Sequence, residues 1–229
     1  MTAAQDSGIN RPDQGRGVID GAFRLLSLLP EVTGDHQLNQ LAELSGIPRP
    51  SVYRLMSQLQ HVGAVDLVGR RYVVGPSITE LARRAEPAKG LRDRALPYMS
   101  ALRQRSGACV SLVAPASQGA VILEVLPGRD QLPVHIHAGR VLPDLAAASL
   151  ILNAAEVPDR VDPVRRTAVD HQHIVPGLHC FAAAITLPDG GRAALQIATN
   201  EPITSPDDLR LAQEASHRIG AALRADAAQ

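Results

Sequence analysis

The sequence predicts an α+β protein with a helical domain first and a sheet-containing domain after it. Three observations support this. Apolar residues recur at helical spacing three times within residues 18–63. Two short apolar runs joined by Gly69-Arg70-Arg71 follow, a pattern typical of a hairpin. From residue 108 onward, short β-rich runs alternate with Gly, Pro and Asp, and amphipathic helices enclose them on both sides. The 229 residues suffice for two domains.

Composition excludes several classes of protein. With 45% hydrophobic and 20% charged residues, the chain can bury real cores and is not intrinsically disordered. Its two cysteines, Cys109 and Cys180, fall short of a disulfide framework and fit a reducing cytoplasm. No run approaches the ~18 apolar residues of a membrane span, and residues 1–16 lack the apolar core of a secretory signal. We therefore expect a cytoplasmic protein with a flexible tail over residues 1–16 and no membrane partner.

The first domain, residues 17–75, is expected to be a winged helix-turn-helix. Residues 18–29 form a helix that Pro30 ends, and residues 38–45 form a second helix that Gly46 ends. A third helix follows and stops at Gly63; its apolar face carries Val52, Leu55, Met56 and Leu59. Residues 64–68 and 72–74 then form the hairpin, whose arginine-bearing tip is the wing.

The outer face of the third helix predicts DNA binding. A helix with an apolar inner face and a basic, hydrogen-bonding outer face is what the major groove accepts. The candidate contacts on the helix and at the wing tip are Arg49, Ser51, Tyr53, Arg54, Ser57, Arg70 and Arg71. The wing arginines are expected to meet the backbone or the minor groove. Two alternatives remain: a solvated polar face, or a winged helix that binds protein instead of DNA.

Net charge does not identify a nucleic-acid binder by itself. The chain has 23 basic and 23 acidic residues, whereas a DNA-binding domain is expected to be basic. Charge is uneven locally, however, because no Asp or Glu lies between Glu43 and Asp66. Phosphate neutralisation requires a basic face and not a basic protein. The local pattern therefore supports the DNA-binding interpretation.

The second part of the chain is expected to begin with a linker helix over residues 76–89, helical from Ile78 to Arg84. The sensor-like domain then occupies residues 90–229. Its predicted helices are residues 90–106, 142–155 and 206–225, and its predicted strands are residues 108–114, 120–126, 133–138, 180–187 and 193–199.

This order of elements resembles the IclR-type transcriptional regulators. The strongest parts of the resemblance are LAELSGIPRPSVYRLMSQLQHVGAVDLVGRRYVVGP and GLHCFAAAITLPDGGRAALQIAT. The resemblance implies that the second domain is a GAF-like α/β sensor that binds a small effector. It also implies that the effector pocket is lined by Ala148, Asp170, Leu178, Cys180, Gln196 and Ala198.

The chain departs from the family pattern in three places. Residues 143–154 read PDLAAASLILNA where the family has a His and a Gly-Lys, and Gln196 and Ala198 stand where two serines are frequent. The segment between Ala155 and Ile174 is also shorter than in the family. The effector's identity therefore does not follow from the resemblance. Arg129 and Arg140 flank a predicted strand, and either is a candidate clamp for a carboxylate effector or simply a surface charge.

The rival hypothesis is a thiol- or metal-dependent hydrolase with an accessory helix-turn-helix. Cys180 lies beside His179, but neighbours on a strand point to opposite faces, and cysteine is commonly buried as a small hydrophobe. Metal-ligand residue types also gather at Asp170, His171, His173, His179 and Cys180, without the fixed short spacing of a zinc site. His171 and His173 could share one strand face, or the segment could be a polar loop. His135 and His137 alternate with apolar residues and are expected to be structural. We expect no catalytic residue, no metal and no cofactor.

The sequence as a whole favours a ligand-responsive DNA-binding regulator. A homodimer, or a dimer of dimers, would present two recognition helices to a near-palindromic double-stranded operator. A small-molecule effector, with an organic acid as the expected class, would shift the population between two arrangements. Repression is preferred to activation, although no residue decides between them.

Overall fold

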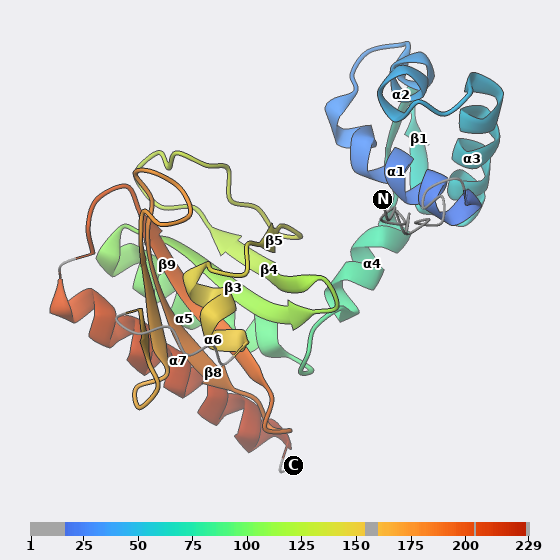
Figure 1. Cartoon of the computed structure of the whole chain (residues 1–229). Helices are drawn as coiled ribbons and strands as arrows, with labels where there is room; N and C mark the ends of the chain where they lie inside the picture. The colour runs from blue at the N-terminus through green and yellow to red at the C-terminus, as the bar shows by residue number, and fades with distance from the viewer. Residues whose placement is uncertain (1–16, 154–159, 204, 228–229) are drawn as a thin grey trace, which may run out of the picture. The chain divides into compact units, whose positions relative to one another are not determined.

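The chain divides into two units, Met1–Ala85 and Glu86–Gln229. The computed structural model describes residues 17–153, 160–203 and 205–227 (Figure 1). The tail expected over residues 1–16 lies outside the described residues, as does the end of the helix predicted for residues 142–155.

The first unit is helical with a two-stranded hairpin, which confirms the predicted class of this domain. Its elements in chain order are α1 (Val18–Leu28), η1 (Leu29–Glu31), α2 (Gln37–Ser45), α3 (Arg49–His61), β1 (Val65–Val68), β2 (Arg71–Val74) and α4 (Pro76–Arg84). Helices α1, α2 and α3 share one core, in which Leu25, Leu41, Val52 and Met56 are almost wholly buried. Gly46 adopts a left-handed conformation, with φ +66°, that ends α2 and lets the chain turn into α3.

The wing is a tight antiparallel hairpin. Val65 pairs with Val74 and Val68 pairs with Arg71, so Gly69 and Arg70 make a two-residue turn. Gly69 has φ +64°, which suits a first turn position that most residues avoid. The base of the wing is tied to α4, because Gly75 donates its N–H to the Ala64 carbonyl at 2.8 Å. The expected linker helix is present, but it ends at Arg84, before residue 89.

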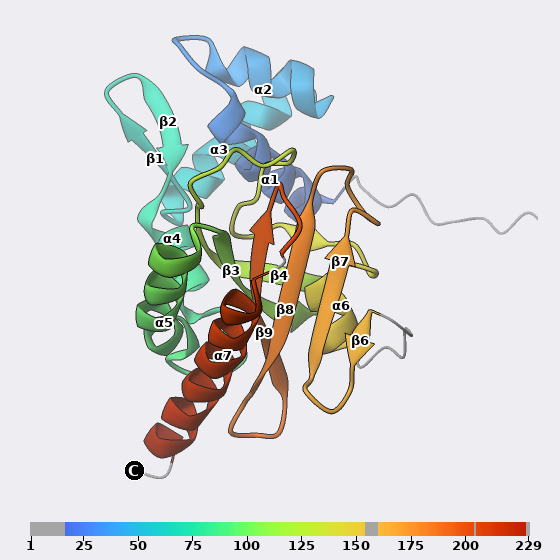
Figure 2. The same ribbon diagram turned by 90° about the vertical axis from the view of Figure 1, so that its left-hand side faces the viewer.

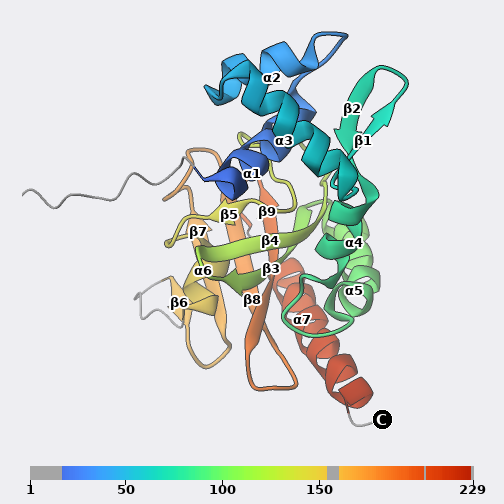
Figure 3. The same ribbon diagram turned by 90° about the vertical axis from the view of Figure 1, so that its right-hand side faces the viewer.

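The second unit is built on a seven-stranded antiparallel sheet in the order β5-β4-β3-β9-β8-β7-β6. The strands are β3 (Cys109–Ala116), β4 (Gly119–Leu126), β5 (Val141–Leu142), β6 (Val161–Asp162), β7 (Thr167–His171), β8 (His179–Thr186) and β9 (Arg192–Thr199). The helices are α5 (Leu91–Ser106), α6 (Ala147–Leu152) and α7 (Pro206–Ala227). Helices α5 and α7 lie on one face of the sheet, and α6 lies on the other (Figures 2 and 3).

Both faces of the central strands are therefore buried. On β8, Phe181, Ala183 and Ile185 pack toward α5 and α7, whereas Cys180 and Ala182 pack toward α6. The same alternation divides β3 and β9, so one sheet separates two cores. Helices before and after the sheet cover it, as predicted, and the α+β class is confirmed. Within the described residues, no helix combines the length and the apolar run that crossing a bilayer requires.

The strand predicted for residues 133–138 is wrong. The side chains there do alternate, with Val134 and Ile136 packed on the core beside α6 and with His135 and His137 exposed. The backbone, however, makes no ladder, and the strand beside β4 is the two-residue β5. A period of two predicts an extended chain, but a strand also needs a neighbouring backbone to pair with, which the pattern does not reveal.

The helix predicted for residues 142–155 begins late. Leu142 belongs to β5, and α6 runs from Ala147 to Leu152. Pro143 disfavours the helical conformation at the preceding residue, which explains the extended start. For the cluster of Asp170, His171, His173, His179 and Cys180, a polar loop is the alternative to a shared strand face. Asp170 and His171 lie on strand β7, which pairs with β8 from Thr167↔Ala183 to His171↔His179, whereas His173 lies in the loop between β7 and β8. A five-residue strand that contains Asp and His carries little apolar pattern.

Gly75→Ala is expected to destabilise the first unit. A Cβ added at Gly75 would lie 2.2 Å from the Gly63 carbonyl oxygen and 3.0 Å from the Ala64 carbonyl carbon, both backbone atoms. The wing base would have to move, at a cost of about 1–3 kcal/mol or more. Urea unfolding followed by circular dichroism should show an earlier first transition. Gly17→Ala is the control, because its added Cβ meets only the flexible Asp20 side chain, at 3.1 Å. Equal midpoints would contradict the expectation.

Candidate DNA interface and effector hollow

Helix α3 presents a polar outer face over a buried apolar inner face. Val52, Leu55, Met56 and Leu59 are buried in the core of the first unit. Of the predicted contact residues on α3, Arg49, Tyr53, Arg54 and Ser57 are exposed, and Ser51 is half-buried. No acidic residue occupies the first turn of α3, so nothing there opposes the partial positive charge of the helix N-terminus.

Arg49 and Tyr53 form one contact surface at the start of α3. The Arg49 Nη2 donates to the Tyr53 hydroxyl at 3.3 Å, and the guanidinium carbon lies 5.6 Å from the centre of the tyrosine ring. Stacking of this kind orients a guanidinium without neutralising it. Tyr53 is 46% exposed. The pair therefore offers a fixed cation and an aromatic edge to a partner.

The wing meets the helix-turn-helix at a shallow hollow. It is lined by Arg49 and Tyr53 from α3, by Arg70 and Tyr72 from the wing, and by residues 35–39 at the start of α2. The structure thus brings together three of the predicted DNA-binding residues, Arg49, Tyr53 and Arg70. Ser51, Arg54, Ser57 and Arg71 do not line this hollow. Arg71 is the first residue of β2 and is exposed.

Sequence reasoning missed Gln37, which fixes the wing. Its side chain is 3% exposed; Oε1 accepts the Tyr72 N–H at 2.7 Å, and Nε2 donates to the Tyr72 carbonyl at 3.1 Å. Nε2 also donates to the Val32 carbonyl at 3.3 Å. One buried amide therefore pairs with both the N–H and the carbonyl of Tyr72. These bonds fix the position of the wing, and with it that of Arg70. A polar residue at the start of a helix gives no sequence pattern that distinguishes this role.

The second unit contains an apolar hollow beside α6, close to the predicted effector pocket. The residues that line it are Ile122, Val134, Ile136, Arg140, Leu142, Pro143, Ala146, Asp170, Ile174, Val175, Leu178, Cys180 and Gln196. Four predicted effector residues, Asp170, Leu178, Cys180 and Gln196, meet here. Ala148 and Ala198 do not line it; both are buried in the adjoining core.

Two polar groups of the hollow are already engaged within the protein. Asp170, 2% exposed, accepts the His173 backbone N–H at 2.9 Å and lies 3.2 Å from His173 Nδ1 and 3.6 Å from Arg160 Nη2. Gln196 Oε1 accepts the Ala148 N–H at 3.2 Å, at the start of α6. Asp170 therefore braces the wall of the hollow through Arg160, whose Nη2 also donates to the Leu145 carbonyl at 2.7 Å.

The two candidate clamping arginines have different surroundings. Arg140 lines the hollow, and its Nη1 donates to the His135 carbonyl. Arg129 does not line it; its Nη2 donates to the Gln104 carbonyl at 3.1 Å, and its side chain packs against Gly107. Of the two, Arg140 is the cation that a ligand in the hollow would meet.

The thiol of Cys180 is buried and is expected to be unreactive. It is 5% exposed, and burial, together with the nearby Asp170 carboxylate, raises its pKa from 9.0 to about 12. Burial also raises the pKa of Cys109. A nucleophilic cysteine needs a lowered pKa and access to solvent. The arrangement therefore suits a small apolar wall residue and not a nucleophile.

The histidines do not assemble a metal site. His171 Nδ1 lies 3.4 Å from His179 Nδ1 across the β7–β8 pair, while His173 lies beyond the end of β7 and turns to Asp170. The alternative in which His171 and His173 share a strand face is therefore wrong, and His173 lies in the loop after β7. In the part of the chain that the structure describes, no three His, Cys, Asp or Glu residues are placed to hold a metal ion.

The geometry of the first unit, three helices with a wing and a basic outward helix, defines a winged helix-turn-helix domain. Residues 18–69 match the family model described as the IclR helix-turn-helix domain. The HTH-type transcriptional regulator TsaQ1/TsaQ2 of Comamonas testosteroni is 32% identical over 160 residues, which cover 62% of this chain and 56% of that protein. The match thus spans little more than half the length of this relative.

Solved structures match most of both units. The Microbacterium hydrocarbonoxydans IclR homologue complexed with 4-hydroxybenzoate has a TM-score of 0.70 at 18% identity, covering 91% of this chain and 100% of its own. Pseudomonas aeruginosa HmgR has a TM-score of 0.68 at 19% identity, covering 89% and 97%. The Thermotoga maritima IclR has a TM-score of 0.65 at 18% identity, covering 90% and 98%. These likenesses establish the fold of both units, and the IclR helix-turn-helix match is confined to residues 18–69.

The Cys180 thiol is expected to resist modification in the folded protein. At pH 8 a thiol-reactive dye such as Ellman's reagent should label neither cysteine of the native chain and should label both after denaturation, because both thiols are buried and protonated. The reaction is followed by absorbance. Rapid labelling of Cys180 in the native protein would contradict this.

The same raised pKa predicts a stability change with pH. The unfolded chain loses the thiol proton near pH 9, whereas the native Cys180 keeps it to about 12. Its contribution is therefore full below pH 9 and declines as pH rises toward 12. The free energy of unfolding should fall less steeply in this window for Cys180→Ala than for the wild type, as measured by urea unfolding.

Proposed function

We propose that this protein is a ligand-responsive, DNA-binding transcriptional regulator. The observation that carries the proposal is the shared surface of α3 and the wing, where Arg49, Tyr53 and Arg70 converge on one hollow. Cations from two elements meet beside the N-terminus of α3, whose first turn holds no acid, and Asp35 is the acid that lines the same hollow. Duplex DNA needs such cations, because phosphate contacts position a recognition helix in the groove.

The effector hollow gives such DNA binding a means of control. Its wall is mostly apolar, with one cation, Arg140, one amide, Gln196, and one carboxylate, Asp170, which lies 3.6 Å from Arg160 Nη2. A few polar groups in an apolar wall are the usual chemistry of a small-molecule site. We propose an organic acid as the effector, held through its carboxylate by Arg140. One structural relative was crystallised with 4-hydroxybenzoate, which supports this class.

The size of the hollow suggests how a ligand could act. Its volume is about 50 Å³, whereas a cavity that accepts benzene is roughly 150 Å³. An aromatic acid would therefore require the wall to open, and we propose that segment 133–138, which pairs with no strand, is the part that moves. A ligand that binds the opened form better would shift the population toward it.

We also propose that the protein acts as a homodimer. On α1, Ile19 and Phe23 lie one turn apart and are 73% and 65% exposed. A second copy of the chain, carrying the same face, would cover both and would present two recognition helices to two half-sites. A homodimeric regulator of this kind is expected to act in the cytoplasm, where its operator DNA lies.

A hydrolase is the less favoured candidate. It would need an accessible nucleophile with a base, but Cys180 is buried, its pKa is raised to about 12, and His179 contacts His171. These observations support a binding role and not a catalytic one for the second unit.

DNA binding is tested on a duplex covering the region upstream of the protein's own gene. Arg49→Ala and Arg70→Ala should each weaken binding about 5- to 100-fold and lower the slope of log affinity against log salt by about one if the lost contact is to a phosphate. Arg105→Ala is the control, because Arg105 is exposed on α5 in the second unit. Gel shift or fluorescence anisotropy over a salt series gives both numbers. No binding at low salt, or binding independent of salt, would sink the proposal.

The homodimer is tested by Phe23→Glu. A carboxylate in the α1 face should separate the copies and weaken operator binding, while the circular dichroism spectrum stays unchanged because Phe23 lies outside the core. Analytical ultracentrifugation measures the mass. A Phe23→Glu protein with the wild-type mass would place the dimer contact elsewhere.

The effector site is tested by isothermal titration with 4-hydroxybenzoate and benzoate. Arg140→Ala should weaken binding at least about tenfold, because a charged hydrogen bond to the carboxylate is lost. Arg129→Ala is a matched control, since Arg129 points away from the hollow. If both acids fail to bind the wild type, or if Arg140→Ala binds them normally, the acid-clamp proposal is wrong.

A further inference from the structure

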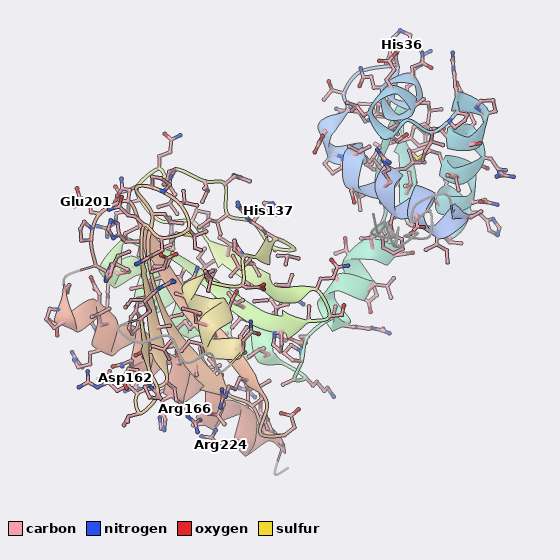
Figure 4. All side chains as sticks on the ribbon, in the orientation of Figure 1. His36, His137, Asp162, Arg166, Glu201 and Arg224 are labelled. Carbon is pink, nitrogen blue, oxygen red and sulfur yellow. The ribbon has the colours of Figure 1, made fainter. Side chains whose placement is uncertain are left out.

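A second hollow, of about 250 Å³, lies on the second unit where the β6–β7 turn, the end of β8 and α7 meet. Its polar lining comes from Arg165, Arg166, Thr186, Gln213, His217 and Arg224. None of these residues lines the effector hollow. Asp162, Arg166 and Arg224 appear together at one end of this unit in Figure 4. The hollow therefore combines three arginines and a histidine from elements far apart in sequence.

Two of the arginines converge on the same residue. Arg166 Nη1 donates to the Thr186 hydroxyl at 3.1 Å, and Arg224 Nη1 donates to the Thr186 carbonyl at 3.4 Å. Gly220 allows this approach, because a Cβ there would lie 2.8 Å from the Thr186 carbonyl oxygen. Each arginine is thus oriented through one terminal nitrogen, and its other N–H groups remain available to a ligand.

Arg166 adopts a conformation that its own side chain does not favour. It has φ +54°, in the left-handed region, at the last position of the turn before β7. Glycine or asparagine would occupy this position at lower cost. An unfavourable backbone conformation at a cationic side chain is a feature of ligand clamps. The turn therefore carries an arginine for a reason other than its backbone geometry.

The acids around this hollow are committed to other groups. Asp162 lies 3.6 Å from Arg165 Nε and accepts the N–H groups of Val164 and Arg165. Asp226, near the end of α7, binds Arg94 at 2.6 Å. Within the described residues, no carboxylate pairs with Arg166 or with Arg224. Two guanidinium groups held to one residue, without an acid between them, repel each other unless an anion joins them.

We propose that this hollow is a binding site for a small polyanion, one that offers two acidic groups of the carboxylate or phosphate type. Arg166 and Arg224 would each hold one acidic group through a forked guanidinium contact. His217 and Gln213 on α7 would complete the site with neutral or cationic donors. Such a ligand would connect the β6–β7 turn to α7 and would stabilise the folded second unit by mass action. The proposal stands apart from the proposed function and does not require DNA binding or an effector in the other hollow.

The test is thermal unfolding of the full chain titrated with citrate and with pyrophosphate, at an ionic strength held constant with sodium chloride. The wild type should show a saturable rise in Tm with at least one of the two probes, and the probe with the lower midpoint distinguishes carboxylate from phosphate ligands. Arg166→Gln and Arg224→Gln should each raise the midpoint about tenfold or more. Arg105→Gln is the matched control, being an exposed arginine outside the hollow. In a ¹⁵N-labelled sample, the amide signals of Ala184, Thr186 and Gly220 should move with the same midpoint.

A further variant separates the charge of Arg166 from its backbone. Arg166→Gly removes the guanidinium and relieves the left-handed conformation, so it should be at least as stable as the wild type and yet lose the response to the anion. An equal response in the wild type and in all the hollow variants would overturn the proposal, as would no response in the wild type. If the Arg166→Gln, Arg224→Gln double variant lost DNA affinity while the wild type ignored both probes, the arginines would belong to a DNA-backbone contact and the proposal would be wrong.

Discussion

The second unit depends on one constraint: its central strands are covered on both faces. Strands β3, β9 and β8 lie in the middle of the sheet, with α5 and α7 on one side and α6 on the other. Side chains that alternate along each strand must therefore all be apolar or internally bonded. The α5–α7 face holds the larger core, built on residues such as Leu195 and Ile219, whereas the α6 face is rich in alanine. Small side chains on that face leave room for a hollow, and the larger ones opposite keep the sheet rigid.

The sequence predicted these central strands because burial on both faces gives them continuous apolar runs. Residues 180–187 and 193–199 were placed within one residue of β8 and β9. Strands β6, at the edge, and β7, next to it, do not follow from the sequence, because one is two residues long and the other contains Asp170 and His171. The strand predicted for residues 133–138 is wrong for the opposite reason. The side chains there alternate, but no neighbouring backbone pairs with them. The pattern of apolar residues therefore predicts which side chains are buried. It predicts strand pairing only where both faces of the strand are buried.

The candidate sites were predictable to a similar degree. Asp170, Cys180 and Gln196 come from strands β7, β8 and β9, and Leu178 directly precedes β8; all four meet at one hollow. Ala148 and Ala198 are buried in the adjoining core. Arg49, Tyr53 and Arg70 also meet, because Gln37 holds the wing beside α2. Its side-chain amide makes two hydrogen bonds to the backbone of Tyr72, 35 residues further along the chain. A contact between positions so distant leaves no local pattern.

Hydrogen bonds next to the effector hollow also suggest how a bound ligand could affect residues outside it. Ile122 on β4 lines the hollow, and the next residue, Leu123, accepts a hydrogen bond at 3.3 Å from Nε of Arg92 at the start of α5. Glu86 holds the same helix start, because its carboxylate accepts the N–H groups of Gly90 at 2.9 Å and Arg92 at 3.0 Å. Glu86 is the first residue of the second unit, immediately after the unit that carries α3 and the wing.

An opening of segment 133–138 would reach β4 through Ile122, whose backbone is hydrogen-bonded to Gly139 and Arg140. From β4 it would reach the bond between Leu123 and Arg92, near the point where the chain enters the second unit. Leu123, Arg92 and Glu86 form this path from the wall of the hollow to the start of the second unit. Each of these contacts is a hydrogen bond that can be made or lost. An effector can change DNA binding only by the difference in its affinity for two forms of the protein, and we propose that the Leu123–Arg92–Glu86 bonds differ between those forms.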